Sequence, residues 1–257
     1  RGGAWGRGVR GRAPPDGVIS QFEGHGQRPE WDWPRYRDSY GDLGRLGLIL
    51  HAEGDSPNNY KVSKQADVLM LLYLFSAEEL RSVLERLGYA LPAEAVRDTV
   101  EFYLARTSNG STLSRLVQGW VMIRADRARS WSLFTQTLAS DLDDSQKGTT
   151  REGVHLGAMA GTVDLLLRGY AGVETRDAVL RLHPELPAEL TRAVFEITYL
   201  GQPIRIELTP ARIRLSLHAG SRHPTHVCVE SQEQTLLPGQ DWDVALAEAP
   251  VPRKESR

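Results

Sequence analysis

Cysteine is nearly absent from this sequence, and so are long apolar runs and any marked excess of charge. The single cysteine, Cys228, excludes an internal disulfide and a zinc site built from several cysteines, and it suits a reducing cytoplasmic location. No apolar run approaches the roughly 20 residues that a membrane helix needs. The formal net charge of −2 gives no electrostatic reason for the whole chain to bind nucleic acid or an anionic membrane. We therefore expect a cytoplasmic protein with neither of these partners.

The two ends differ in composition from the rest of the 257 residues. The opening RGGAWGRGVRGRAPP lacks the apolar core of a signal peptide. Gly/Arg-rich sequence of this kind is also typical of RNA-binding tails. Because no nucleic-acid module follows, we interpret residues 1–13 as a disordered end, and residues 247–257 likewise.

Helical patterns dominate from about residue 32 to residue 173. SAEELRSVLERLGY has a capping box at Ser76 and Glu79, and LPAEAVRDTVEFYLART opens with Pro92 in a first-turn position. The run Val68–Phe75 is apolar throughout and predicts an element that is buried on every side. Six helices of roughly 10–20 residues with short connections predict a mainly α domain of antiparallel helix pairs at residues 14–192.

After residue 193 the apolar period changes to two, which predicts antiparallel strands. Turns are expected at Gly201-Gln202-Pro203 and at Thr209-Pro210. We therefore expect a small antiparallel β domain at residues 193–246. The alternating apolar residues are Ile204, Ile206, Leu208, Ile213, Leu215 and Leu217.

The first of three polar clusters, each before a helix, is Lys64-Gln65 in YKVSKQADVLMLLYLF. If the helix begins near Ser63, Lys64 lies in its first turn, where the helix dipole disfavours a cation. A solvated surface lysine would tolerate this small cost. Alternatively, a lysine and a carboxamide at the end of an internal helix could hydrogen-bond sugar hydroxyls.

The second cluster is RTSNGSTLS, in which hydroxyl side chains surround Gly110 just before a helix. Such a loop can hold an oxyanion with hydroxyl and backbone N–H groups. The alternative is ordinary capping of the helix by serine or threonine.

The third cluster is GTTREGVHLGAMAGT, where glycine recurs every fourth residue at 153, 157 and 161. Thr149 and Glu152 form a capping box. The glycines could serve close helix packing, with His155 as a core residue. They could instead bring backbone close to a ligand, with threonines and His155 around an anion.

A calcium loop is suggested by the acidic and polar residues from Asp141 to Glu152, but Gln146 replaces the glycine that the turn requires. No metal site is expected.

Together these motifs resemble glycoside hydrolase family 65, whose members include the inverting trehalose, maltose and kojibiose phosphorylases. The resemblance covers about residues 16–244. It implies the C-terminal half of an (α/α)6 barrel followed by a C-terminal β domain. The motifs that carry it are DGVISQFEG (16–24), NNYKVSKQADVLMLLYLF (58–75), RTSNGSTLS (106–114) and GTTREGVHLGAMAGTVDLL (148–166).

The resemblance also implies roles for individual residues. Lys64 and Gln65 match the pair that binds the glucosyl unit whose bond is broken. The family's usual form of the RTSNGSTLS loop has a histidine at the place of Asn109. The residues that the resemblance implies around the phosphate are Ser111, Thr112, Thr150, Gly153 and His155.

The implied reaction is phosphorolysis of an α-glucosidic disaccharide with inversion, giving β-glucose 1-phosphate. Inorganic phosphate would be a co-substrate, no cofactor is implied, and a homodimer of the parent protein is compatible with the family. The family's catalytic acid is a glutamate in a GPDEYHE-like motif that is absent here. Glu23 and Glu53 are the only nearby substitutes, and neither lies in a motif of that kind. We therefore expect a C-terminal fragment that is inactive alone. A family hydrolase that uses water and a non-catalytic carbohydrate-binding remnant are the alternatives.

Overall fold

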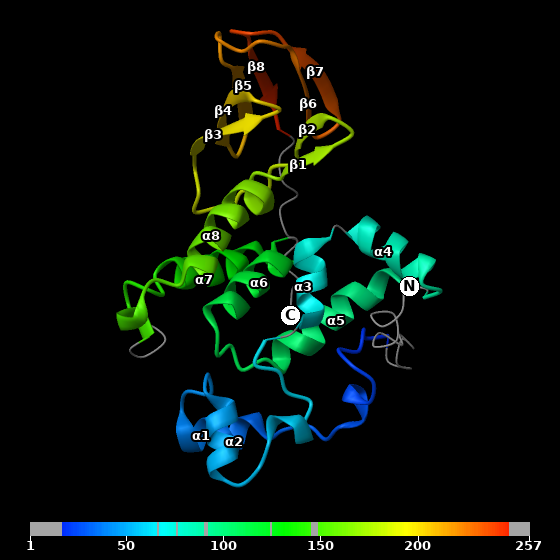
Figure 1. The fold of residues 1–257 in the computed structure, drawn as a ribbon, viewed down its shortest axis with the longest axis vertical. Coiled ribbons are helices and arrows are strands. Elements are labelled where there is room, and N and C mark those ends of the chain that lie inside the picture. The colour runs from blue at the N-terminus through cyan, green and yellow to red at the C-terminus, as the bar shows by residue number, and fades with distance from the viewer. Residues whose placement is uncertain are drawn as a thin grey trace, which may run out of the picture. The chain divides into compact units, whose positions relative to one another are not determined.

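The computed structural model describes residues 17–65, 67–75, 77–89, 92–123, 125–144 and 149–246. It forms two compact units, which divide after Thr162 and are described separately (Figure 1). The first unit is helical and the second is built mainly from strands. The predicted disordered ends at 1–13 and 247–257, the predicted cap Ser76, and Gln146 lie outside the described residues.

The helical character predicted for the first part of the chain is confirmed. None of the helices in the described ranges is both long enough and apolar enough to cross a membrane. The α-helices are α1 (Trp33–Tyr40), α2 (Leu46–Ala52), α3 (Asp67–Leu74), α4 (Ala77–Arg86), α5 (Ala93–Ala105), α6 (Thr112–Met122), α7 (Arg127–Leu138) and α8 (Leu156–Asp164). Shorter helical turns are η2 (His25–Gln27), η3 (Pro57–Asn59), η4 (Thr149–Glu152) and the π-helix η5 (Leu165–Tyr170).

The main core of the first unit lies between α3, α5 and α6, and a second cluster surrounds α1 and α2. Burial of these apolar side chains is the principal contribution to the stability of the unit. The main core consists of Val68, Leu69, Val100, Tyr103, Val117 and Met122. The second cluster consists of Trp31, Leu43, Leu46, Leu50 and Val62.

Contrary to our prediction, the apolar helix α3 is not buried on every side. Val68 and Leu69 are buried, but Leu74 is 57% exposed and Phe75 is 38% exposed. An apolar sequence shows which faces can be buried, whereas actual burial needs an element on each face. In the described part of the chain, α5 and α6 cover the face of α3 that carries Val68 and Leu69.

Helix α3 begins at Asp67 and not near Ser63, so Lys64 is not in its first turn. Ser63 is extended instead: its N–H donates to the Arg106 carbonyl, and its carbonyl accepts from the Ser108 N–H, both at 2.9 Å. Because the backbone groups of Ser63 are used in these hydrogen bonds to another segment, they are not available to a helix, and α3 begins farther along the chain. Asp67 in the first turn is favourable, because a carboxylate stabilises the positive end of the helix dipole.

The sequence TTREGVHLGAMAGTVDLLLRGYAG at 149–172 predicts a single helix, but the structure divides it into η4, α8 and η5. Gly153 has φ of 129°, a conformation that favours glycine and that separates η4 from α8. His155 therefore lies directly before α8 and not inside a helix.

Residues before α1 are attached to α5 by hydrogen bonds and ring contacts. Ile19 N–H donates to Thr99 Oγ1 at 2.9 Å, and Gln21 N–H donates to the Tyr103 hydroxyl at 2.7 Å. His25, only 2% exposed, stacks on the Tyr103 ring with centroids 5.6 Å apart. This burial, together with the nearby cation of Arg28, lowers the pKa of His25.

The second unit contains two four-stranded sheets, with strand orders β1-β2-β6-β7 and β3-β4-β5-β8. All neighbouring strands are antiparallel except β2 and β6, which run parallel. The strands are β1 (Val173–Arg176), β2 (Val179–Leu182), β3 (Ala193–Tyr199), β4 (Gln202–Thr209), β5 (Arg212–Leu217), β6 (Thr225–Val229), β7 (Gln232–Leu236) and β8 (Asp241–Ala245).

The alternation read from the sequence in β4 and β5 is confirmed, since Ile204, Ile206 and Leu208 are all completely buried. The first predicted turn is displaced, because Leu200 and Gly201 take positive φ while Gln202 already belongs to β4. Leu200 and Gly201 therefore make the two-residue connection that matches the twist of a hairpin.

Strands begin before residue 193, because β1 and β2 form a hairpin at residues 173–182. Each of these strands has only four residues. β1 is largely exposed and shows no alternation, and β2 alternates over too short a run to stand out in the sequence. Their turn uses Asp177 and Ala178 at positive φ in place of a glycine, which removed the usual turn signal as well.

Candidate functional site

A parallel β-bridge connects the segment before α3 to the loop before α6. The bridge pairs Ser63 with Thr107. Because Lys64 and Gln65 follow Ser63 directly, the bridge brings the first polar cluster beside the second. The structure thus brings together the Lys64-Gln65 cluster and the RTSNGSTLS cluster, which are about 40 residues apart in the sequence.

Lys64 lies along the RTSNGSTLS loop. Its carbonyl accepts a hydrogen bond from Ser114 Oγ at 3.2 Å, and a Cβ added at Gly110 would lie 3.5 Å from Lys64 Cγ. Lys64 is exposed and Gln65 is half-buried. The pair is therefore accessible at one edge of the loop.

The shape of the loop depends on two backbone positions. Gly110 lies against Gly44, and a Cβ at Gly110 would overlap the Gly44 carbonyl oxygen. Asn109 has φ of 55°, in the left-handed region, and its Oδ1 accepts a hydrogen bond from Gln118 Nε2 at 2.6 Å. Gln118 is 3% exposed, so a buried side chain of α6 holds the loop at Asn109.

Ser111 and Thr112 mark the beginning of α6. Ser111 Oγ accepts a hydrogen bond from the Leu113 N–H at 3.3 Å, which is the capping arrangement we weighed as the alternative. Thr112, the first residue of the helix, is 4% exposed. Backbone N–H groups at such a helix start are the kind of donors that favour anions.

In the third cluster, His155 is held by Asp141. The His155 N–H donates to Asp141 Oδ2 at 2.9 Å, and the ring Nδ1 lies 2.5 Å from Asp141 Oδ1. The hydrogen bond from His155 lowers the pKa of Asp141 and keeps it ionised. Asp141, the first residue of the calcium pattern that we rejected, is thus a partner of His155.

Thr150 and Gly153 lie in the turn that precedes His155. The Thr150 N–H donates to Asp144 Oδ1 at 3.4 Å, and the Gly153 N–H donates to the Thr150 carbonyl at 3.1 Å. The buried hydroxyl of Thr150 finds no hydrogen-bond partner among the described residues. This turn therefore combines a polar side chain with a backbone bent at Gly153.

The starts of α6 and α8 lie next to one another. A Cβ at Gly157 would be 3.6 Å from Leu113 Cδ2, and a Cβ at Gly161 would overlap the Leu116 side chain. The close-packing interpretation is therefore confirmed for Gly161, whereas a Cβ at Gly157 would make an ordinary contact. As a consequence, His155 lies directly before a helix whose first turn contacts the first turn of α6.

Neither carboxylate considered as a substitute acid has the environment that acid catalysis needs. Glu53 accepts hydrogen bonds from the hydroxyls of Tyr36 at 2.5 Å and Tyr40 at 2.7 Å, which lower its pKa. A catalytic acid at neutral pH requires the opposite shift. Glu23 is an exposed surface residue.

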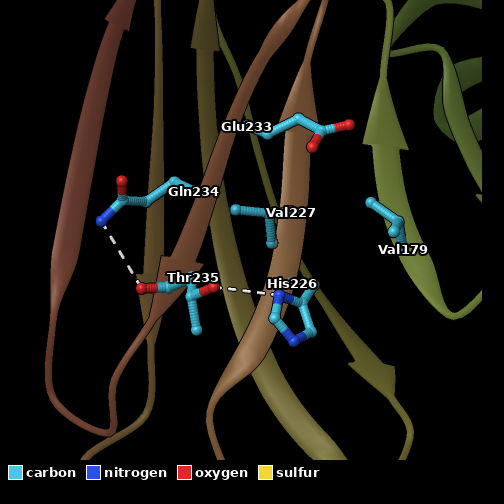
Figure 2. A pocket seen from close by; sticks show the side chains of 6 residues that line it. All are labelled: Val179, His226, Val227, Glu233, Gln234 and Thr235. Carbon is cyan, nitrogen blue, oxygen red and sulfur yellow. Dashed lines mark hydrogen bonds between the residues drawn. The ribbon is translucent and has the colours of Figure 1, made fainter.

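A hollow of about 380 Å³ in the second unit is lined by side chains of β2, β6 and β7 (Figure 2). Thr235 Oγ1 and His226 Nδ1 form a cross-strand hydrogen bond of 2.9 Å in it. None of the predicted site residues lines this hollow.

Comparison with known families explains this combination of a helical unit and a strand-rich unit. Residues 12–164 match the glycosyl hydrolase family 65 central catalytic domain, and residues 173–236 match the glycosyl hydrolase family 65 C-terminal domain. The chain belongs to glycosyl hydrolase family 65. The second match agrees with strands that begin at Val173.

Two curated relatives illustrate the similarity of this family 65 chain. An uncharacterized glycosyl hydrolase of Mycobacterium tuberculosis is 47% identical over 232 residues, which are 90% of this chain and 18% of the relative. The trehalose 6-phosphate phosphorylase of Lactococcus lactis is 34% identical over 205 residues, 79% of this chain and 27% of that protein. The chain thus spans about a fifth to a quarter of their length.

A solved structure assigned as a kojibiose phosphorylase from the human microbiome has a TM-score of 0.72 to this family 65 chain. The alignment covers 95% of this chain and 33% of the other, with 16% identity. At that identity the likeness shows a shared fold of helices followed by a β domain.

Proposed function

We propose that this chain is the C-terminal portion of an inverting disaccharide phosphorylase, which acts on an α-glucosidic disaccharide and phosphate to give β-glucose 1-phosphate. Membership of family 65 supports the enzyme class, and the names of several relatives, including the trehalose 6-phosphate phosphorylase, support phosphorolysis. The single observation that carries the proposal is the assembly of Lys64-Gln65, the RTSNGSTLS loop and the start of α6 by the Ser63–Thr107 bridge.

In this proposal Lys64 and Gln65 bind the glucosyl unit. An ammonium group and a carboxamide offer the donors and the acceptor that ring hydroxyls need. The position of Lys64 against Gly110 supports the assignment, because a sugar bound by Lys64 would then lie beside the proposed anion site.

Phosphate would bind around the adjacent starts of α6 and α8. The residues we assign to it offer hydroxyl, imidazole and backbone N–H groups, which suit a phosphate anion. The contact between Gly157 and Leu113 supports a single site, because it brings the two helix starts together. The assigned residues are Ser111, Thr112, Thr150, Gly153 and His155.

The chemistry follows from the charge of the nucleophile. A phosphate oxygen would attack the anomeric carbon from the face opposite the glycosidic bond, while a protonated carboxyl group donates its proton to the leaving oxygen. An inverting hydrolase needs a second carboxylate to activate water. Phosphate is already anionic, so hydroxyl, imidazole and N–H groups that position it can replace that base.

We propose that the catalytic acid lies outside this chain and that the chain is inactive alone. The lowered pKa of Glu53 supports this view. Exposed apolar side chains in the first unit support it as well, because Leu74, Leu142 and Leu156 are 57%, 88% and 73% exposed. Such residues would be covered if upstream helices complete an (α/α)6 barrel.

A hydrolase of the same family is the second candidate, and a non-catalytic carbohydrate-binding remnant is the third. The experiment that separates them assays this chain, and a longer parent protein that contains the upstream acid, with trehalose, maltose and kojibiose. We expect no turnover by this chain and phosphate-dependent release of β-glucose 1-phosphate by the parent. Turnover by this chain would contradict its proposed inactivity, and phosphate-independent release of glucose would identify a hydrolase.

The Lys64→Ala variant of the parent tests the sugar assignment. Loss of a hydrogen bond from a charged group should lower kcat/KM for the disaccharide roughly 10- to 100-fold. Lys61→Ala is the matched control, because Lys61 is three residues away and pairs with Glu30 at 3.4 Å. Equal effects of the two substitutions would remove the assignment.

A further inference from the structure

The contact between Asp141 and His155 is more specific than a surface ion pair. Both oxygens of the carboxylate are used, one by the His155 backbone N–H at 2.9 Å and one by ring Nδ1 at 2.5 Å. The Asp141 side chain is 9% exposed and the His155 side chain is 27% exposed. Two contacts from one carboxylate fix both the main chain and the ring of the histidine.

The segment that carries Asp141 is itself well anchored after α7. Ser140, 1% exposed, donates its hydroxyl to the Thr137 carbonyl at 2.7 Å, and the Asp143 N–H donates to the Ala139 carbonyl at 2.9 Å. The carboxylate thus comes from a turn with little freedom to move.

The backbone of His155 is also held by the first turn of α8. Its carbonyl accepts from the Ala158 N–H at 2.9 Å and from the Met159 N–H at 3.0 Å. The imidazole is therefore fixed on one side by Asp141 and through its backbone by the helix. A carboxylate on one ring nitrogen sets which nitrogen carries the first proton, and it stabilises the imidazolium when the second nitrogen is protonated.

We propose that Asp141 is a positioning residue for phosphate: it accepts the Nδ1–H of His155 and so directs Nε2, as the second donor, to the anion. The inference rests on the proposed phosphorylase function, because it takes the phosphate site to include His155. Asp141 itself would not touch phosphate, since a carboxylate repels that anion. Its charge instead balances the positive charge that His155 needs in order to donate.

The competing explanation is purely structural: Asp141 would only tie the turn after α7 to the start of α8. Asp141→Asn separates the two, because asparagine retains the size and an acceptor oxygen but loses the charge. Asp143→Asn is the matched control, since Asp143 is two residues away and exposed. His155→Gln, alone and combined with Asp141→Asn, completes a double-mutant cycle.

The first measurement is a long-range proton–nitrogen spectrum of the histidine rings in the 257-residue chain, recorded while inorganic phosphate is added. We expect the His155 signals of the unchanged chain and of Asp143→Asn to report a protonated Nδ1, and Nε2 to shift as phosphate binds. In Asp141→Asn the Nδ1–H form should no longer be fixed, and the apparent Kd for phosphate should rise roughly 10-fold or more.

The second measurement is the KM for phosphate and for disaccharide in the longer parent protein. Asp141→Asn should raise the KM for phosphate, with a smaller change for the disaccharide, and should add little in the His155→Gln background. If Asp141→Asn weakens phosphate binding equally in that background, or leaves it unchanged, Asp141 does not act through His155 and the proposal fails. If phosphate moves no signal in the unchanged chain and the parent needs none, it is the proposed function that fails.

Discussion

Gly161 of α8 lies so close to Leu116 of α6 that a side chain at the glycine would overlap the leucine. The two helices that begin at the proposed phosphate site are thus in direct contact one to two turns farther along. The separation of their starts depends on a position where only hydrogen fits.

The first prediction is that Gly161→Ala destabilises the first unit by about 1–3 kcal/mol, because the added methyl group overpacks the contact with Leu116. Gly157→Ala is the control on the same helix, since its Cβ would meet Leu113 at an ordinary 3.6 Å. There the gain in helix propensity, up to about 1 kcal/mol, should leave stability equal or higher. Urea unfolding followed by circular dichroism gives both values, and equal loss in the two variants would contradict the packing argument.

The second prediction concerns His25, whose pKa is lowered from its ordinary value of 6.5 by burial. The unfolded chain binds the proton more readily, so the contribution of His25 to stability is complete above about pH 6.5 and is lost as pH falls toward the lowered pKa. His25→Gln should therefore reduce the slope of stability against pH in this window. His51→Gln, at an exposed position, should not. Unfolding free energies measured from pH 7.5 to about pH 5 provide the test, and an unchanged slope in His25→Gln would exclude His25 as its source.

The third prediction concerns the tyrosines bound to Glu53. Hydrogen bonds to the Glu53 carboxylate raise the pKa of Tyr36 and Tyr40 above the ordinary phenol value. In Glu53→Gln the carboxylate charge is gone, so both phenols should ionise at lower pH. Ultraviolet absorbance of the phenolate during an alkaline titration measures the change. Glu23→Gln is the matched control, and a titration that is the same in all three proteins would show that these hydrogen bonds are not formed.

The fourth prediction separates backbone strain from hydrogen bonding at Asn109. Asn109→Gly keeps the left-handed φ accessible and loses only the contact with Gln118, which should cost about 1–3 kcal/mol because a buried amide is left without that partner. Asn109→Ala loses the same contact and in addition places an alanine at φ of 55°, for a further cost of about 1–2 kcal/mol. Thermal and urea unfolding of the two variants measure the difference, which would be zero if the loop relaxes.

The sequence was a good guide wherever a residue acts through its neighbours in the chain. The alternation in β4 and β5 has this local character and corresponds to buried side chains in the structure. The four-residue spacing of glycines is also local, and at Gly161 it corresponds to close packing. The family was also recognisable, because its motifs are contiguous stretches of sequence.

The sequence was a poor guide where distant segments meet. No local sequence feature predicts that Ser63 pairs with Thr107, a contact that keeps the residue extended before α3 begins. Asp141 and His155 are likewise 14 residues apart in the sequence. Exposure of Leu74 depends on which elements surround α3, which its own composition does not specify.

The parallel pairing of β2 with β6 sets an order on the folding of the second unit. Leu180 and Leu182 are opposite Val227 and Val229, and all of β3, β4 and β5 lies between them in the chain. Such a pairing closes a long loop before it gains any contact, which is slow compared with closing a hairpin. During synthesis the edge of β2 that pairs with β6 would therefore stay uncovered until the ribosome has released β6. In chains interrupted before Val229 that edge would remain open permanently.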